Sequence, residues 1–204
     1  MIDGSLGELS KEQGLALDVM LRSEGRLEEL IEKMIQFSLE ASGQFTLQIK
    51  AVNLSEVVDL ALKQAKIKAK NRPVALSIDL GIDPCPVRVD QEKIQWVVME
   101  LVDNAIKFTP PGGQVKVGLD QDTNLAHIYV IDSGIGISPE RLSEIFEPYH
   151  QLDGSSTRHY GGVGLGLSLA KKIIEAHGSK VKVTSEVGQG TFIQFELPII
   201  RPDD

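Results

Sequence analysis

The sequence predicts an α+β fold in which helices pack on one face of a mixed, mostly antiparallel sheet. Segments of alternating apolar and polar residues, typical of strands, recur between residues 45 and 198. Segments with apolar residues three or four positions apart, typical of amphipathic helices, lie between them. Two pairs of predicted strands are joined by short polar or glycine-containing turns, which favours antiparallel neighbours. Helices covering one face of a sheet satisfy this order of elements.

The composition excludes several classes of protein. A net charge of −8 over 204 residues argues against non-specific nucleic-acid binding, which needs an excess of basic side chains. The single cysteine, Cys85, excludes an intrachain disulfide, and no Cys/His cluster has metal-ligand spacing. No segment approaches the roughly 18 apolar residues of a membrane span, and the first residues do not resemble a signal peptide. We therefore expect a cytoplasmic location, although an intact protein with a membrane anchor elsewhere stays open.

The first 43 residues are predicted to form a long amphipathic helix that is separate from the domain at 44–204. No proline occurs between Leu6 and Phe37, and "ASGQ" at 41–44 ends the helical pattern. Apolar residues at spacings of three and four form one stripe: Leu17, Met20, Leu27, Ile31 and Met34. Two interpretations stay open, a helix that packs on its own domain and a helix that belongs to a bundle or dimer.

Local patterns place the elements of the second segment. The predicted strands are 45–52, 74–80, 114–120 and 124–132, with a closing hairpin at 180–198, and the predicted helices are 53–70, 90–108 and 163–178. Asn53 and Asp90 are at positions typical of helix caps. Cys85 is expected in a turn between two prolines. The alternation of 124–132 predicts that His127, Tyr129 and Ile131 are buried on one side.

The predicted helix 90–108 has two faces. Ile94, Val97, Val98, Leu101 and Ala105 occupy its core-facing positions. Glu100, Asn104 and Lys107 are spaced i, i+4 and i+7 and form a second stripe beside the apolar one. An acid, an amide and an ammonium on one line suit a metal–phosphate group, with oxygen ligands for Mg²⁺ and a cation for an anionic oxygen. The alternative is a solvated face with an Asp103–Lys107 pair.

Two glycine-rich segments follow. In "DSGIGIS", Asp132 ends a predicted strand and can accept hydrogen bonds from an amine, while Gly134 and Gly136 let a flat ring approach the backbone. In "GGVGLGLSLA", glycines precede a helix whose first N–H groups can face an anion. The second segment lacks the lysine of a P-loop and follows a polar loop, which argues against a dinucleotide fingerprint. The alternative for each segment is an ordinary turn. The stretch from 133 to 162 is too long for an idle connection and predicts a functional loop.

The order of the motifs is more specific than any one of them. The chain carries "ELVDNAIKFTP", "DSGIGIS", "IFEPYHQ", a polar loop, "GGVGLGLSLA" and "GQGTFIQFELP". This series resembles the N, G1, F and G2 boxes of the ATP-binding catalytic domain of sensor histidine kinases, in the superfamily shared with DNA gyrase, MutL and the Hsp-type chaperones. The resemblance covers about Phe45 to Pro198. It implies a two-layer α/β sandwich of the Bergerat type, with ATP and Mg²⁺ as cofactors.

The resemblance also implies roles for individual residues. Asp132 would bind the adenine amino group, Asn104 would ligate Mg²⁺, and Lys107 would reach a phosphate. The remaining cofactor-binding residues implied by the motifs are Gly134, Gly136, Tyr149, Arg158, Gly162, Gly164, Leu165, Gly166 and Thr191. The loop from His150 to Tyr160 would be the ATP lid. The N-terminal helix is similar to the second helix of the dimerisation and histidine-phosphotransfer hairpin, which implies a homodimer through that helix.

Two departures from the family pattern qualify these implications. The histidines, His127, His150, His159 and His177, all lack the context of a phosphoacceptor box. We therefore expect the γ-phosphoryl group to pass to a histidine outside this chain, on an acceptor helix of an intact system with a response regulator. The chain would then be a fragment, or a protein that acts on a histidine elsewhere, and we favour the fragment; in either case it would not autophosphorylate alone. Glu100 stands where many members carry asparagine, and it could be a general base or a Mg²⁺ ligand.

Other classes of protein stay open at this point. A gyrase- or MutL-like ATPase module would use Glu100 as the base for water. An anti-sigma-type serine kinase fits the N-terminal helix poorly. A non-catalytic interaction protein would be expected to lose Asn104, Asp132 or the glycines, yet these are present.

Overall fold

The computed structural model describes residues 10–17, 19–21, 23, 24, 27, 31 and 34, and then 46–69, 72–81, 84–150 and 164–201. The chain forms two units, Met1–Phe45 and Thr46–Asp204. In the first unit, the described residues between 11 and 34 are helical. Four residues of the predicted stripe are exposed there: Met20, Leu27, Ile31 and Met34. A bundle or dimer partner for this helix stays a prediction.

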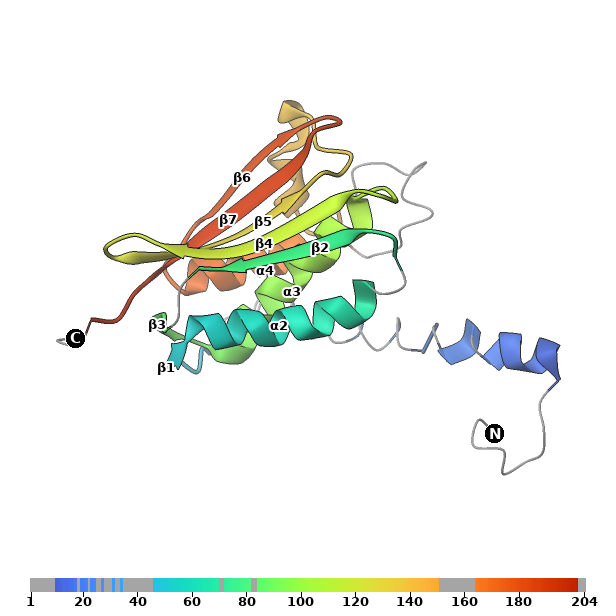
Figure 1. The fold of residues 1–204 in the computed structure, drawn as a ribbon, viewed down its shortest axis with the longest axis horizontal. Helices are drawn as coiled ribbons and strands as arrows, with labels where there is room; N and C mark the ends of the chain where they lie inside the picture. Colours follow the sequence, from blue (N-terminus) through green and yellow to red (C-terminus); the bar gives the residue numbers. More distant parts are fainter. Residues whose placement is uncertain are drawn as a thin grey trace, which may run out of the picture. The chain divides into compact units, whose positions relative to one another are not determined.

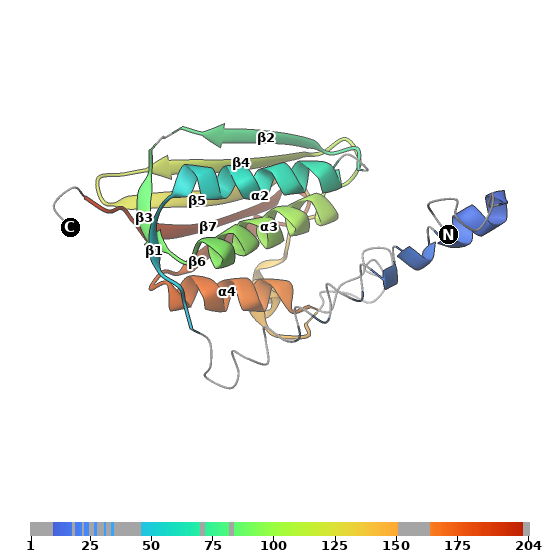
Figure 2. The ribbon, with the colours of Figure 1, turned by 90° about the horizontal axis from the view of Figure 1, so that it is seen from below.

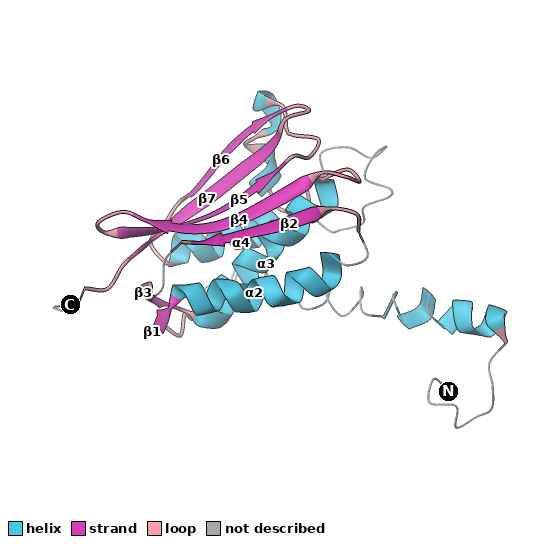
Figure 3. Cartoon of the chain, viewed as in Figure 1, coloured by secondary structure: helices cyan, strands magenta, loops and turns pink. Residues whose placement is uncertain are grey.

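The second unit contains a five-stranded sheet covered by helices on one face. The strands lie in the order β2 (Ala75–Leu80), β4 (Gln114–Gln121), β5 (Leu125–Asp132), β7 (Gly190–Pro198) and β6 (Val181–Glu186). Only the β2–β4 pair of this sheet is parallel. Helices α2 (Leu54–Ala69), α3 (Gln91–Phe108) and α4 (Gly166–Ala176) lie on the same face (Figures 1 and 2). Figure 3 separates the two layers by colour. The predicted α+β sandwich is confirmed.

The core lies between the sheet and α3. The five core residues predicted on α3 are all buried, at 5% exposure or less. The prediction for β5 was wrong, because Ala126, Ile128 and Val130 face the helices and Ile131 is 38% exposed. Cross-strand partners share a face, and Val130 pairs with the buried Val117 and Ile193 of its neighbours. The alternation was therefore correct, but β5 carries apolar residues on both faces and its neighbours decide which one is buried.

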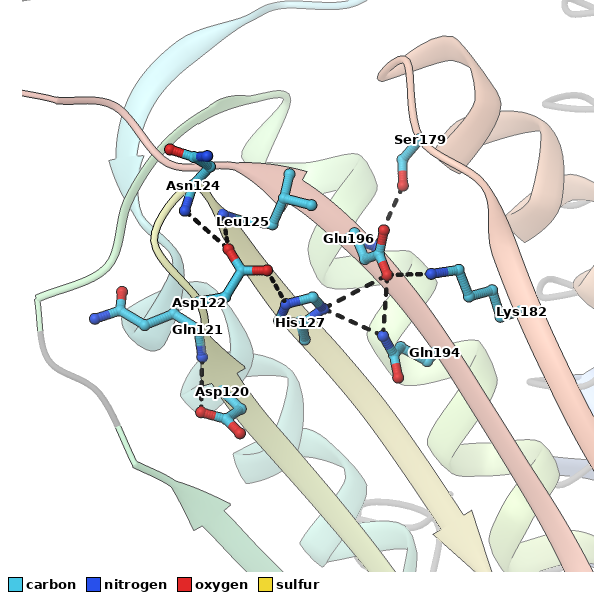
Figure 4. Close-up of polar contacts among 10 residues, drawn as sticks. All are labelled: Asp120, Gln121, Asp122, Asn124, Leu125, His127, Ser179, Lys182, Gln194 and Glu196. Carbon is cyan, nitrogen blue, oxygen red and sulfur yellow. Dashed lines mark hydrogen bonds and ion pairs between the residues drawn. The ribbon is translucent and has the colours of Figure 1, made fainter.

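The other face of the sheet carries a network of polar side chains (Figure 4). His127 lies between Asp122, at 3.2 Å from Nε2, and Gln194, whose amide is 3.2 Å from Nδ1. Glu196 contacts Gln194 and Lys182 in the same network. Tyr129, also on this face, lies across Gly118, where a Cβ would come within 2.0 Å of the ring. His127 and Tyr129, which were predicted to be buried, are thus half-exposed on the outer face of the sheet.

A second, two-stranded sheet was only partly predicted. β1 (Lys50–Asn53) pairs with β3 (Pro86–Val89) in antiparallel register. The strand predicted at 45–52 is observed only over Lys50–Asn53, because β3 has four residues with which to pair. Gln48 lies outside the strand, and its N–H donates to the Asp90 carboxylate at 2.9 Å. β3 itself was missed because prolines flank Cys85, although Pro86 stands at the first position of a strand, where it is tolerated. Cys85 is fully buried.

The ends of the helices follow their local sequence. Asn53 precedes α2 and its side chain accepts from the N–H groups of Ser55 and Cys85, at 3.3 and 3.0 Å. Asp90 is the N-cap of α3 and accepts from the N–H of Lys93 at 3.2 Å. α4 begins at Gly166 rather than at 163. Gly164 has a φ of +74°, which a right-handed helix cannot contain.

Asp90 joins three parts of the second unit. Its carboxylate caps α3 and binds the N–H of Gln48, and its own N–H donates to Nε2 of His177 at 3.0 Å. Because a backbone N–H only donates, Nε2 is unprotonated, and Nδ1 therefore carries the proton that it donates to the Ile173 carbonyl at 2.8 Å. The start of α3 and the end of α4 are thereby held together.

Replacing Asp90 should destabilise the second unit. Asp90→Ala removes an N-cap and leaves the N–H of Gln48 without its acceptor, and we expect a loss of about 1–3 kcal/mol in the free energy of unfolding. Urea denaturation measures it. Gln91→Ala, at the exposed first residue of the same helix, is the matched control and should change stability by less than about 0.5 kcal/mol. Equal effects of the two substitutions would contradict this role of Asp90.

Candidate functional site

Glu100 is buried against the first residue of α4. Its side chain is 7% exposed, and a Cβ built on Gly166 would lie 2.0 Å from its Oε2. The alternative of a solvated face therefore does not hold for this residue. The first N–H groups of a helix favour a nearby anion, and the absence of a side chain at Gly166 makes room for the carboxylate.

Asn104 and Lys107 lie one and two turns further along α3. The Asn104 amide donates from Nδ2 to the Glu100 carbonyl at 2.8 Å, so its Oδ1 is the atom left to accept or to ligate. Lys107 places Nζ 4.9 Å from the centre of the Phe108 ring. Both side chains are half-buried. Together with Glu100 they present two kinds of oxygen and one cation along a single edge of α3.

Asp132, at the end of β5, is held by backbone N–H groups. Its Oδ1 accepts from Gly134 at 2.8 Å and from Thr191 at 3.2 Å. Among the described residues, Oδ2 has no partner. Burial raises the pKa of the Asp132 carboxyl above its ordinary value of 3.8, although the two N–H groups oppose this shift. The side chain thus offers one oriented acceptor oxygen in a half-buried place.

The turn after Asp132 packs tightly between α3 and the β6–β7 hairpin. The N–H of Ile135 donates to the Phe108 carbonyl at 3.2 Å, which attaches the turn to the end of α3. A Cβ on Gly134 would lie 2.7 Å from that carbonyl oxygen. Gly136 has a φ of +67°, and its Cβ would lie 1.9 Å from the Glu186 carbonyl oxygen. These two glycines are therefore required by close backbone approach, whatever else they do.

The start of α4 contacts the segment that follows the second 3-10 turn, η2 (Glu144–Phe146). The N–H of Tyr149 donates to the Gly164 carbonyl at 3.1 Å. Tyr149 is 58% exposed with a φ of +62°, an uncommon backbone for a bulky residue. Leu165 is 1% exposed, so only its backbone is placed to meet a ligand. Arg158 and Gly162 lie outside the described residues.

A row of polar side chains lies at one end of the helix-facing side of the sheet. Thr191 pairs in register with Asp132 on one side and with Ser185 on the other, and the three share one face. The preceding row, Val130–Ile193–Val183, is apolar. We call Asp132, Thr191 and Ser185 the polar row. Sequence reasoning missed Ser185, although a serine that follows Val181 and Val183 on the inward face of a strand marks the place.

The donor set fits a Mg²⁺ ion that is shared with a phosphate group. No cluster of three or more His, Cys, Asp or Glu side chains that could hold a metal occurs in the part of the chain that the structure describes. Mg²⁺ is commonly held by one or two protein oxygens together with waters and substrate phosphates. The carboxylate of Glu100 and Oδ1 of Asn104 are oxygens of this kind. The described helices also include none that is long and apolar enough to cross a membrane.

The site therefore has two chemically different ends. At one end, the polar row offers acceptor oxygens beside a turn that has glycines at its closest contacts. At the other end, Glu100 stands against the first residue of α4, whose N–H groups attract anions, and Asn104 and Lys107 follow it along α3. The turn at Ile135 joins the two ends through the Phe108 carbonyl. A ligand with an amine-bearing ring and a phosphate chain suits this arrangement.

The chain is similar to known proteins. Residues 89–201 match the family model described as histidine kinase-, DNA gyrase B-, and HSP90-like ATPase. The chain is 32% identical over 196 residues to the circadian input-output histidine kinase CikA of Synechococcus elongatus, covering 95% of this chain and 26% of CikA. It is 33% identical over 194 residues to the histidine protein kinase DivJ of Caulobacter vibrioides, covering 95% of this chain and 32% of DivJ.

Solved structures agree in fold. Full-length ShkA in complex with AMPPNP superposes with a TM-score of 0.79 at 23% identity, covering 94% of this chain and 40% of ShkA. Histidine kinase ThkA in complex with the response regulator protein TrrA gives a TM-score of 0.71 at 22% identity, covering 95% of this chain and 53% of ThkA.

The chain belongs to the family of histidine kinase-, DNA gyrase B- and HSP90-like ATPases. Its ATP-binding domain is of the histidine kinase type, since the relatives at 32% and 33% identity are named histidine kinases. This confirms the family, the fold and the histidine kinase type of ATP-binding domain implied by the ordered motifs. The chain spans about a third or less of the length of these curated relatives.

The packing at Gly136 yields a stability prediction. Gly136→Ala combines a positive φ with a backbone collision, and we expect it to cost about 2–4 kcal/mol of unfolding free energy. Gly188 also has a positive φ, of +79°, but a Cβ there meets nothing within 4 Å. Gly188→Ala is therefore the matched control and should cost about 1 kcal/mol. Denaturant midpoints of the two variants should differ clearly, and similar midpoints would contradict the close approach.

The buried carboxyl of Asp132 yields a pH prediction. Its pKa is higher in the folded than in the unfolded chain, so above its ordinary value of 3.8 the folded state retains a proton that the unfolded state has lost. The contribution of this group to stability is thus present at low pH and is lost as pH rises through the raised pKa. Asp132→Asn should therefore gain in stability relative to the unaltered chain as pH increases from about 3.8 to 7. Unfolding free energies measured across this range test the sign, and a relative loss would refute it.

Proposed function

We propose that this chain is the nucleotide-binding catalytic portion of a two-component sensor histidine kinase. It would bind ATP and transfer the γ-phosphoryl group to a histidine outside the chain. The observation that carries the proposal is the carboxylate of Asp132, whose Oδ1 is occupied by two N–H groups while Oδ2 is left as an acceptor. A half-buried acceptor of this kind suits the amino group of adenine.

The other end of the site would hold the triphosphate. We propose that the N–H groups at the start of α4, from Gly164 through Gly166, meet the phosphates, as helix N-termini do. Lys107 would add a positive charge. Arg158 and Gly162 are assigned to the same phosphate contacts, Thr191, Gly134 and Gly136 to the adenine side, and Tyr149 and Leu165 to the border of the pocket.

Glu100 and Asn104 would hold Mg²⁺ on the phosphate chain. When bound, the ion would offset the negative charge of the phosphate oxygens. Transfer then needs little covalent chemistry from the protein. A nitrogen of the acceptor histidine forms a bond to the γ-phosphorus as the bond between that phosphorus and the β,γ-bridging oxygen breaks, and ADP departs with the electron pair. The chain's part in this step is to orient the triphosphate and to stabilise its charge.

The partners of the intact system are also part of this proposal. We assign the acceptor to a histidine-bearing helix that pairs with the N-terminal helix, and the next recipient of the phosphoryl group to a response regulator. The described histidines support an external acceptor: His127 lies in the outer polar network, His150 lies 3.3 Å from the Glu144 carboxylate, and His177 is tied to Asp90. The ThkA structure in complex with the response regulator protein TrrA supports such a partner, and the exposed stripe between 20 and 34 supports a homodimer.

Asp132→Asn tests the central assignment. The asparagine can still accept from Gly134 and Thr191 through Oδ1, but it presents an amide donor where the carboxylate offers Oδ2. We expect calorimetric binding of ADP in Mg²⁺ to fall by at least about 100-fold with the fold retained. Unchanged affinity would overturn the adenine assignment. Steady ATP hydrolysis that Glu100→Ala removes, with no transfer to a supplied acceptor hairpin, would favour a gyrase-like ATPase instead.

A further inference from the structure

Ser185, on β6, makes three hydrogen bonds with one hydroxyl group. Its Oγ accepts from the N–H of Ile137 at 2.9 Å and donates to the Gly190 carbonyl at 2.8 Å. It also lies 3.0 Å from the Oγ1 of Thr191. Its partners belong to the turn after β5 and to the first two residues of β7. A single side chain therefore connects the three segments around Asp132.

The hydrogens of these groups have one consistent arrangement. A serine hydroxyl has one proton and two lone pairs. The Ile137 N–H is a donor and takes one lone pair, while the Gly190 carbonyl is an acceptor and takes the proton. The Thr191 hydroxyl must then donate its proton to the second lone pair of Ser185. Thr191 is consequently left with lone pairs alone for any ligand.

We infer that Ser185 is a positioning residue that sets the base preference of the site through Thr191. This inference deepens the proposed function and rests on it. Thr191 and Asp132 are neighbours in the polar row, so the ligand edge would meet two acceptors, the Thr191 hydroxyl oxygen and Oδ2 of Asp132. The amino group of a 6-amino purine has two N–H donors, one for each of these acceptors, directly or through a water. A 6-oxo purine presents a carbonyl oxygen at the same position, which two acceptors repel. The two bases also differ at N1, which is a lone pair in the first and an N–H in the second, so the inference concerns contacts at position 6.

Removing Ser185 should change the preference rather than only the affinity. In Ser185→Ala the Thr191 hydroxyl loses its acceptor and can turn its proton toward the ligand. The Thr191 hydroxyl can then donate to a 6-oxo group, whereas in the unaltered chain it can only accept from the ligand. We expect the affinity for ADP to fall about three- to tenfold. The affinity for inosine diphosphate, the 6-oxo counterpart, should hold or rise, so the ratio of ADP affinity to inosine diphosphate affinity falls by at least the loss for ADP.

The experiment is calorimetric titration of the 204-residue chain with ADP and with inosine diphosphate, both in Mg²⁺. Ser185→Thr keeps the hydroxyl and should retain most of the preference. Thr184→Ala is the matched control, because Thr184 precedes Ser185 on the same strand with its side chain exposed, and it should leave both affinities unchanged. Thr191→Val removes the intermediary, and in that background Ser185→Ala should no longer alter the ratio.

The outcomes separate the possible failures. An equal loss of affinity for both nucleotides in Ser185→Ala would show a merely structural role and overturn the inference. A change of ratio that persists in the Thr191→Val background would also overturn it, because Ser185 would then not act through Thr191. A wild-type chain that binds neither nucleotide overturns the proposed function and this inference together. If Asp132→Asn abolishes nucleotide binding but Ser185→Ala leaves both affinities unaltered, this inference alone is overturned.

Discussion

The site depends on the pair of backbone hydrogen bonds to Oδ1 of Asp132. One comes from the turn that follows β5 and the other from the neighbouring strand β7, so the carboxylate holds both segments and is oriented by both. Burial works against this arrangement because it disfavours the charged form, and the pKa of the carboxyl is raised in consequence. The two N–H groups only partly offset that cost. Carboxyl groups whose pKa is raised in this way cluster at functional sites.

Close packing keeps the remaining parts in place. The glycines in this region are positions where two backbones, or a backbone and a buried carboxylate, approach too closely for a Cβ. Gly190 is the extreme case, since a Cβ there would lie 1.8 Å from the Asp132 carbonyl oxygen. In the proposed site, the glycines at the start of α4 would also let a phosphate approach the first N–H groups of the helix. Glycine would then serve both the fold and a ligand, which is why the glycine-rich segments alone did not distinguish a turn from a binding site.

Local patterns were sufficient to predict much of the fold. The limits of α3, its N-cap at Asp90 and its five core residues follow from helical periodicity and capping chemistry. Features that depend on distant partners were not predicted. The buried face of β5 is chosen by Val117 and Ile193, the strand β3 depends on β1, and the burial of Glu100 depends on the absence of a side chain at Gly166. Each of these is decided by a neighbour far away in the sequence.

The site shows the same division. Asp132, Asn104 and the glycines could be proposed because they occur in an ordered series of motifs. Ser185 lies in none of them, and its importance appears only when β6 is placed beside β7. Its hydroxyl has as many partners as it has hydrogen-bonding positions, which leaves the Thr191 hydroxyl one direction in which to donate. The hydrogen-bonding character of Thr191 therefore depends on where its proton points, and that direction is determined by Ser185 of β6, whose other partners lie in β7 and in the turn after β5.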